Sequence, residues 1–136
     1  MTTISEVMTA DPIAAQSNDS IRNVASQMAE GDFGSMPVLD DGRLVGIVTD
    51  RDITVRAVAQ GIAGDEAVSR IMSTDPICVT PDCTIQQAAQ LMQEKQLRRL
   101  YVQDGDSLCG VVALKDVALE VGDQLSGQTL EEISRR

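Results

Sequence analysis

The chain has 136 residues, with 21 acidic and 11 basic side chains and a formal net charge of −10 at pH 7. This length fits one compact domain, or two small units that share a core. So acidic a surface repels phosphate backbones and anionic lipid, which argues against broad nucleic-acid or membrane binding. The sequence shows no signal peptide and no apolar run near membrane-spanning length, so we expect a cytoplasmic protein.

Histidine is absent, and the three cysteines form no Cys-x-x-Cys pair. The chain therefore lacks the usual general base and the commonest metal ligand. An odd cysteine count argues against a disulfide framework and fits a reducing compartment. We expect neither an enzyme nor a metal site. Cys78 and Cys109 are expected in the core, whereas Cys83, near a helix start, is left without a role.

The chain also repeats itself, because residues 4–57 align without a gap on residues 68–121. A tandem repeat predicts two like units packed about a pseudo-twofold axis, with the cleft between them as the first place to look for function. Each unit alone is marginal in size, which favours obligate pairing. We expect a first repeat at 1–60, a linker at 61–67, a second repeat at 68–122 and a charged tail at 123–136.

In both copies, Asp-Pro predicts a turn, a short apolar strand follows at 13–15 and 77–79, and polar turns at 16–19 and 80–83 supply helix caps. Apolar residues at i, i+3, i+4 and i+7 then predict amphipathic helices. These residues are Ile21, Val24, Ala25 and Met28 in the first copy and Ile85, Ala88, Ala89 and Met92 in the second. We expect Gly31 to end the first helix in the left-handed conformation.

Two strands separated by Asp-Gly turns predict a hairpin in each copy, at 36–48 and 100–112. A second helix is expected from residue 50 to about 60 and from 114 to about 122, and the tail is expected to add a helical turn around Leu130 and Ile133. The element order predicts an α+β fold of two tandem β-α-β-β-α units.

The strand-to-helix junction Thr49-Asp50-Arg51-Asp52 admits two interpretations. Thr-x-x-Asp is a capping box, in which each side chain accepts a hydrogen bond from the other residue's amide. Alternatively, N–H groups at a helix start attract anions, and a short carboxylate suits a ribose diol. In the second copy Ala113 breaks the box and Asp116 remains, which favours binding without deciding it.

The combination of Val-Met-x-x-Asp-Pro, the amphipathic helix, Pro37-Val38 and Gly46-x-x-Thr49-x-x-Asp52 resembles the cystathionine-β-synthase (CBS) domain. Two in tandem resemble a Bateman module, as in small stand-alone prokaryotic CBS-pair proteins of the hypoxic-response type. The resemblance spans residues 4 to 122. It implies a regulatory sensor that binds an adenosine-containing ligand (AMP, ADP, ATP or S-adenosylmethionine) between the repeats, with no required cofactor. It also implies a homodimer whose conformation signals to a protein partner in trans.

The resemblance also implies roles for single residues. Asp52 and Asp116 would hold ribose hydroxyls, Thr49 would lie near ribose or phosphate, and Arg98 and Arg99 would contact phosphates. The remaining expected ligand-binding residues line the base or neighbour these positions: Ile13, Ala14, Ile77, Cys78, Ser35, Arg51 and Lys115. Residues 34–36 include no basic side chain, and Ala113 weakens the Asp116 site. We therefore expect at most one strong ligand site.

A ligand-free dimeric scaffold or protein-interaction module is the alternative. In that case the same residues only cap helices, and Arg98-Arg99 is a solvated or interface pair.

Overall fold

The computed structural model describes residues 2–122, so the predicted tail at 123–136 lies outside the described residues. The described chain forms two compact units. We call residues 13–76 and 106–108 the first-repeat unit, and residues 2–12, 77–105 and 109–122 the second-repeat unit.

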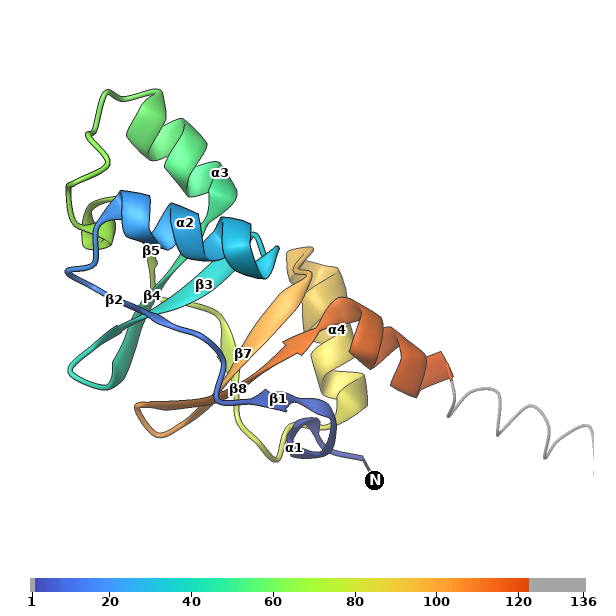
Figure 1. The fold of residues 1–136 in the computed structure, drawn as a ribbon. Coiled ribbons are helices and arrows are strands. Elements are labelled where there is room, and N and C mark those ends of the chain that lie inside the picture. The colour runs from blue at the N-terminus through green and yellow to red at the C-terminus, as the bar shows by residue number, and fades with distance from the viewer. Residues whose placement is uncertain (1, 123–136) are drawn as a thin grey trace, which may run out of the picture. The chain divides into compact units, whose positions relative to one another are not determined.

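The first-repeat unit is built on a sheet with the strand order β2-β3-β4-β5. β2 (Ala15–Gln16) runs parallel to β3 (Ser35–Asp40), while β4 (Arg43–Thr49) is antiparallel to both β3 and β5 (Ser73–Thr74). α2 (Ile21–Gly31) connects β2 to β3 (Figure 1). After β4, α3 (Asp50–Asp52) continues into the π-helix η1 (Ile53–Val58), and the 3-10 turn η2 (Val68–Arg70) precedes β5.

The second-repeat unit has a sheet with the strand order β1-β8-β7-β6. β6 (Cys78–Val79) runs parallel to β7 (Arg99–Asp104), and β1 (Thr9–Ala10) is antiparallel to β8 (Ser107–Ala113). α1 (Ile4–Val7) precedes β1, α4 (Ile85–Lys95) connects β6 to β7, and residues 114–122 are helical. Both units therefore confirm the predicted β-α-β-β-α order of an α+β fold, although β2 and β6 are shorter than the predicted strands.

Both connecting helices begin at a hydroxyl cap. Ser20 Oγ accepts a hydrogen bond from the Asn23 amide at 3.0 Å, and Thr84 forms a capping box with Gln87. The caps thus lie one residue beyond the polar turns from which we predicted them. In the first turn, the Asp19 carboxylate instead accepts from the Gln16 amide at 2.8 Å.

The prediction that Gly31 ends the first helix in the left-handed conformation was wrong. Gly31 is helical, and Asp32 is the left-handed residue, with φ 53°. Gln96 takes the same place after α4, with φ 54°. Aspartate tolerates this conformation better than most residues, because its short polar side chain can bond locally.

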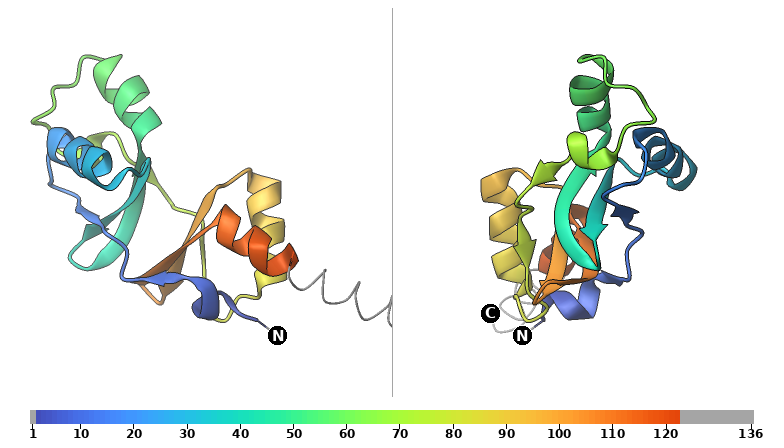
Figure 2. Two further views of the ribbon diagram at one scale, coloured as in Figure 1. Left: turned by 45° about the vertical axis from the view of Figure 1, so that its right-hand side comes forward. Right: turned by 90° about the vertical axis from the view of Figure 1, so that its left-hand side faces the viewer.

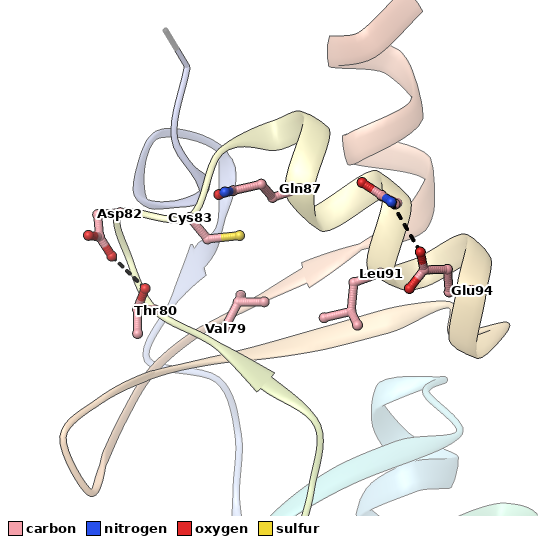
Figure 3. Close-up of a pocket in the computed structure, with 8 residues that line it drawn as sticks. Val79, Thr80, Asp82, Cys83, Gln87, Leu91 and Glu94 are labelled. Atoms are coloured by element: carbon pink, nitrogen blue, oxygen red, sulfur yellow. Dashed lines mark hydrogen bonds between the residues drawn. The ribbon is translucent and has the colours of Figure 1, made fainter.

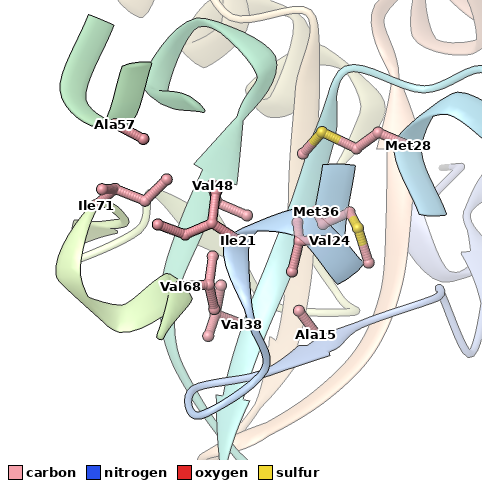
Figure 4. Close-up of a cluster of buried hydrophobic side chains, with 10 residues drawn as sticks. All are labelled: Ala15, Ile21, Val24, Met28, Met36, Val38, Val48, Ala57, Val68 and Ile71. Atoms are coloured by element: carbon pink, nitrogen blue, oxygen red, sulfur yellow. The ribbon is translucent and has the colours of Figure 1, made fainter. Parts of the chain in front are cut away.

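Each unit has one apolar core that joins its helices to one face of its sheet. In the first-repeat unit, Met36 and Val48 lie opposite one another on β3 and β4, and the buried side chains of α2 pack over them (Figure 4). The predicted helix periodicity is confirmed, since Ile21, Val24 and Met28 are buried in α2 and Ile85, Ala88 and Met92 in α4.

The segment that begins each repeat packs in the unit that the other repeat builds. Ile4 is fully buried among second-repeat residues, and its amide donates to the Cys83 carbonyl at 2.8 Å. Val68 is fully buried in the first-repeat unit, and its amide donates to the Asp19 carbonyl at 2.8 Å. The repeat boundaries given above concern the sequence rather than these compact units, and they stay a prediction.

The hairpins turn where Asp-Gly predicted. Asp41 and Gly42 both have positive φ, 52° and 80°, as a type I′ turn requires, and Gly105 has φ 62° in the second hairpin. The turns and the two strands of each hairpin can be followed in Figure 2.

We predict that Ile4→Ala destabilises the protein by about 2–5 kcal/mol, because it empties a fully buried position. Ile13→Ala is the control: the same truncation at a side chain that is 63% exposed should change stability by less than about 0.5 kcal/mol. Urea unfolding measures both. Equal effects would contradict burial of the leading segment.

We also predict that Gly46→Ala destabilises the first-repeat unit by about 1–3 kcal/mol through overpacking. A β-carbon there would lie 2.7 Å from both the Met72 sulfur and the Ser73 carbonyl oxygen, where β5 pairs with β4. Gly122→Ala meets nothing within 4 Å and serves as the control. Thermal unfolding of the two variants should differ, and a wild-type melting temperature for Gly46→Ala would show that the chain at Met72 and Ser73 does not pack against Gly46.

Candidate functional site

Three chain segments meet at one end of the first-repeat sheet. Ser35, which begins β3, is paired with Thr49, which ends β4, and the Asp50 amide donates to the Gly34 carbonyl at 2.9 Å. The parallel pairing of Ala15 with Val38 places Ile13 at the same end. Ile13, Ala14, Ser35, Thr49, Arg51 and Asp52 thus lie at or next to one end of this sheet, and their part in ligand binding stays a prediction.

Thr49 and Asp52 form the predicted capping box. The Thr49 amide donates to Asp52 Oδ2 at 2.9 Å, and the Asp52 amide donates to Thr49 Oγ1 at 3.1 Å. Asp52 Oδ1 also lies 3.7 Å from Arg56 Nε, and the Asp52 side chain is only 13% exposed. The interpretation of this motif as a capping box is therefore confirmed. A carboxylate has about four acceptor positions, so these contacts leave room for hydroxyl donors.

The same backbone frame recurs in the second-repeat unit without the cap. The Leu114 amide donates to the Arg98 carbonyl at 2.7 Å, and the pairing of Cys78 with Tyr101 places Ile77 beside Leu100. Ala113 has no hydroxyl to accept a hydrogen bond from the Asp116 amide, as Thr49 accepts from the Asp52 amide, and Asp116 is half-buried.

Four polar side chains at the corresponding end of the second-repeat sheet make no hydrogen bond or ion pair within the described residues. These are the side chains of Arg98, Arg99, Lys115 and Asp116. Arg98, Arg99 and Lys115 are exposed. Asp116 is thus the less constrained of the two motif carboxylates, in agreement with the loss of the capping threonine at Ala113.

Each sheet end also exposes an isoleucine. Ile13 is 63% exposed and Ile77 is 39% exposed, while Ala15, two residues after Ile13, is fully buried. A large exposed apolar side chain at a sheet end provides a surface on which a flat heterocycle can pack.

A groove of about 490 Å³ between β6 and α4 was not predicted from the sequence (Figure 3). Its acids already have partners, since Thr80 donates to Asp82 and Gln90 Nε2 donates to Glu94 Oε1. Burial, and then the neighbouring Asp82, raise the pKa of the Cys83 thiol in this groove. Its acidic lining makes it a poor phosphate site.

The other two cysteines are half-buried rather than fully in the core. Burial raises the pKa of both the Cys78 and the Cys109 thiols, and Cys109 Sγ donates to the Val102 carbonyl at 3.3 Å. A catalytic thiolate needs the opposite shift. Among residues 2–122 no three metal-ligating side chains are grouped to hold an ion.

Apolar surface also gathers on the last helix of each repeat. Val58 in η1 is 72% exposed, and Leu119 in the helix at 114–122 is 66% exposed. In the second-repeat unit an apolar groove of about 660 Å³ lies between α4 and this helix. No helix in the described part of the chain has the length and apolar character needed to cross a membrane.

Comparison with known proteins gives the family. The family model of the CBS domain matches residues 4–58 and 68–123. The CBS domain-containing protein YhcV of Bacillus subtilis is 36% identical over 137 residues, which cover 100% of this chain and 98% of YhcV.

Two solved structures are similar in both fold and sequence. Hypoxic Response Protein I with two coordinated zinc ions is 29% identical with a TM-score of 0.79, over 86% of this chain and 97% of that one. The CBS domain pair of protein MJ0100, in complex with 5′-methylthioadenosine and S-adenosyl-L-methionine, is 27% identical with a TM-score of 0.78, over 91% and 98%. With two matched domains along nearly its whole described length, the chain belongs to the CBS-domain family.

Proposed function

We propose that this chain is a non-catalytic regulatory module that binds an adenosine-containing small molecule and signals through the conformation of a homodimer. One observation carries the proposal. In each unit an exposed isoleucine lies at the same sheet end as an aspartate of the strand-to-helix junction, Ile13 with Asp52 and Ile77 with Asp116. An apolar surface suits a purine, and a carboxylate suits the two hydroxyls of a ribose.

The ligands bound to the MJ0100 pair support the choice of an adenosyl compound over other nucleosides. AMP, ADP, ATP and S-adenosylmethionine are the candidates. The tandem repeat alone predicts that the ligand lies in a cleft between the repeats, and this location stays a prediction. Such a ligand signals only if it binds one conformation of the module more tightly than another, and a protein partner would then read the favoured conformation.

A homodimer is part of this proposal. Val55 and Leu119 occupy equivalent positions in the two repeats, and both are exposed together with Val58. On the last helix of each repeat, these apolar side chains are surface that a second copy of the chain can cover.

The capping box favours the ligand-free scaffold as the second candidate. Its two hydrogen bonds explain Thr49 and Asp52 without any ligand. Asp116 discriminates between the candidates, because no cap explains it.

We predict that adenosyl ligands stabilise the protein. A ligand at 100 times its Kd adds about 2.7 kcal/mol to the free energy of unfolding. Thermal melting with AMP, ADP, ATP, 5′-methylthioadenosine and S-adenosylmethionine tests this on protein shown by mass spectrometry to be free of copurified ligand. No shift with any of the five would favour the scaffold.

We predict different effects for the two motif aspartates. Without ligand, Asp52→Ala should cost about 0.5–2 kcal/mol of stability because it removes a cap, whereas Asp116→Ala should change stability by less than about 0.5 kcal/mol. With saturating ligand, Asp116→Ala should lose part of the stabilisation that wild type gains. Full ligand stabilisation of Asp116→Ala would remove that residue from the site.

We predict by light scattering a particle of twice the chain mass of 14.6 kDa. Leu119→Ser should shift this mass toward the monomer, because it places a hydroxyl in the proposed interface, while Arg43→Ser, on an exposed strand start, should not. A wild-type monomer at every concentration tested would contradict the homodimer.

A further inference from the structure

The two sheet ends differ in charge, and we propose that they take different ligands. The second-repeat end binds a phosphorylated adenosine nucleotide, and the first-repeat end binds an adenosyl ligand that carries no phosphate. This inference rests on the proposed function and adds to it the ligand class of each end.

The charge difference lies on matching backbone. The amide that begins the helix donates to the carbonyl that precedes the hairpin in both units, Asp50 to Gly34 and Leu114 to Arg98. Five equivalent positions surround this bond. In the first repeat they are Gly34, Ser35, Asp50, Arg51 and Asp52, and in the second they are Arg98, Arg99, Leu114, Lys115 and Asp116. One base therefore stands against two acids at one end, and three bases stand against one acid at the other.

The bases of the second-repeat end are available to a ligand. Arg98, Arg99 and Lys115 are exposed, and within the described chain no acid neutralises them. Elsewhere, Arg56 and Arg70 each pair with an acid four residues earlier in the chain. Guanidinium groups match phosphate oxygens bidentately, so two adjacent arginines and a lysine form a local phosphate site on a chain whose overall charge repels anions.

The first-repeat end opposes a phosphate. A β-carbon on Gly34 would lie 3.0 Å from Asp50 Oδ2, so the Asp50 carboxylate lies against the backbone at the position where the second repeat has Arg98. Its Oδ1 is also held by the Arg51 amide at 2.8 Å. A phosphate here would approach the carboxylates of both Asp50 and Asp52, and like charges at short range repel. An uncharged thioether or a sulfonium meets no such repulsion.

Calorimetric titration of the intact protein with ATP and with 5′-methylthioadenosine tests the assignment. Arg99→Ser gives the second repeat the residue of the first, and it should weaken ATP binding about tenfold or more, since hydrogen bonds to charged groups are the strong ones. It should leave 5′-methylthioadenosine binding unchanged. The matched control is Arg43→Ser, because Arg43 is also exposed and also begins a strand. It should change neither affinity.

The reciprocal variant is Asp50→Leu, which gives the first repeat the residue of the second. It should raise the number of ATP molecules bound per chain, because it removes the carboxylate that excludes phosphate. Salt dependence needs no variant: wild-type affinity for ATP should fall as salt rises from about 0.05 to 0.5 M, while that for 5′-methylthioadenosine should not.

Each outcome decides one proposal. Binding of 5′-methylthioadenosine without ATP, or ATP binding that ignores both salt and Arg99→Ser, overturns the charge assignment and leaves the regulatory function standing. Failure of every adenosyl ligand to bind overturns the proposed function, and this inference with it.

Discussion

Burial of each repeat's leading segment in the unit of the other repeat is the constraint on which the rest of this structure depends. Ile4 and Val68 are fully buried there. The residues that follow them form the edge strands, β1 beside β8 and β5 beside β4. A unit of repeat size is marginal alone, so the exchange gives each core and each sheet its missing part. The chain passes from one unit to the other just after Pro12 and Pro76, where Asp11 and Asp75 take left-handed conformations with φ 51° and 56°.

The candidate site in each unit begins where the chain enters that unit. Ile13 and Ile77 follow directly, before any strand begins, and the parallel pairing of β2 with β3 and of β6 with β7 holds them at the sheet ends where the helices start. Their exposed side chains therefore lie at the same sheet end as the motif aspartate of their own repeat, through strand pairing within that repeat. The two sheet ends of a tandem repeat can be compared directly, because the same backbone frame carries a different set of charges at each. The proposal of different ligands rests on this difference in charge.

Elements with local signals were predictable from the sequence, whereas those that depend on distant partners were not. Apolar spacing located α2 and α4, Asp-Gly located both hairpins, and Thr49-x-x-Asp52 revealed the cap. β1 and β5 have only two residues each, and their partners lie far along the chain, so no periodicity revealed them. The approach of Asp50 to Gly34 likewise depends on the packing of a helix start against a strand start, which spacing cannot show.

Backbone amide shifts of the labelled protein, followed by NMR during titration with ATP, test the central claim most directly. The account predicts that the largest changes fall on residues 77–78, 98–99 and 114–116, which lie at one end of the second-repeat sheet. Changes confined to the acidic groove lined by Asp82 and Glu94, or no changes at all, would contradict it.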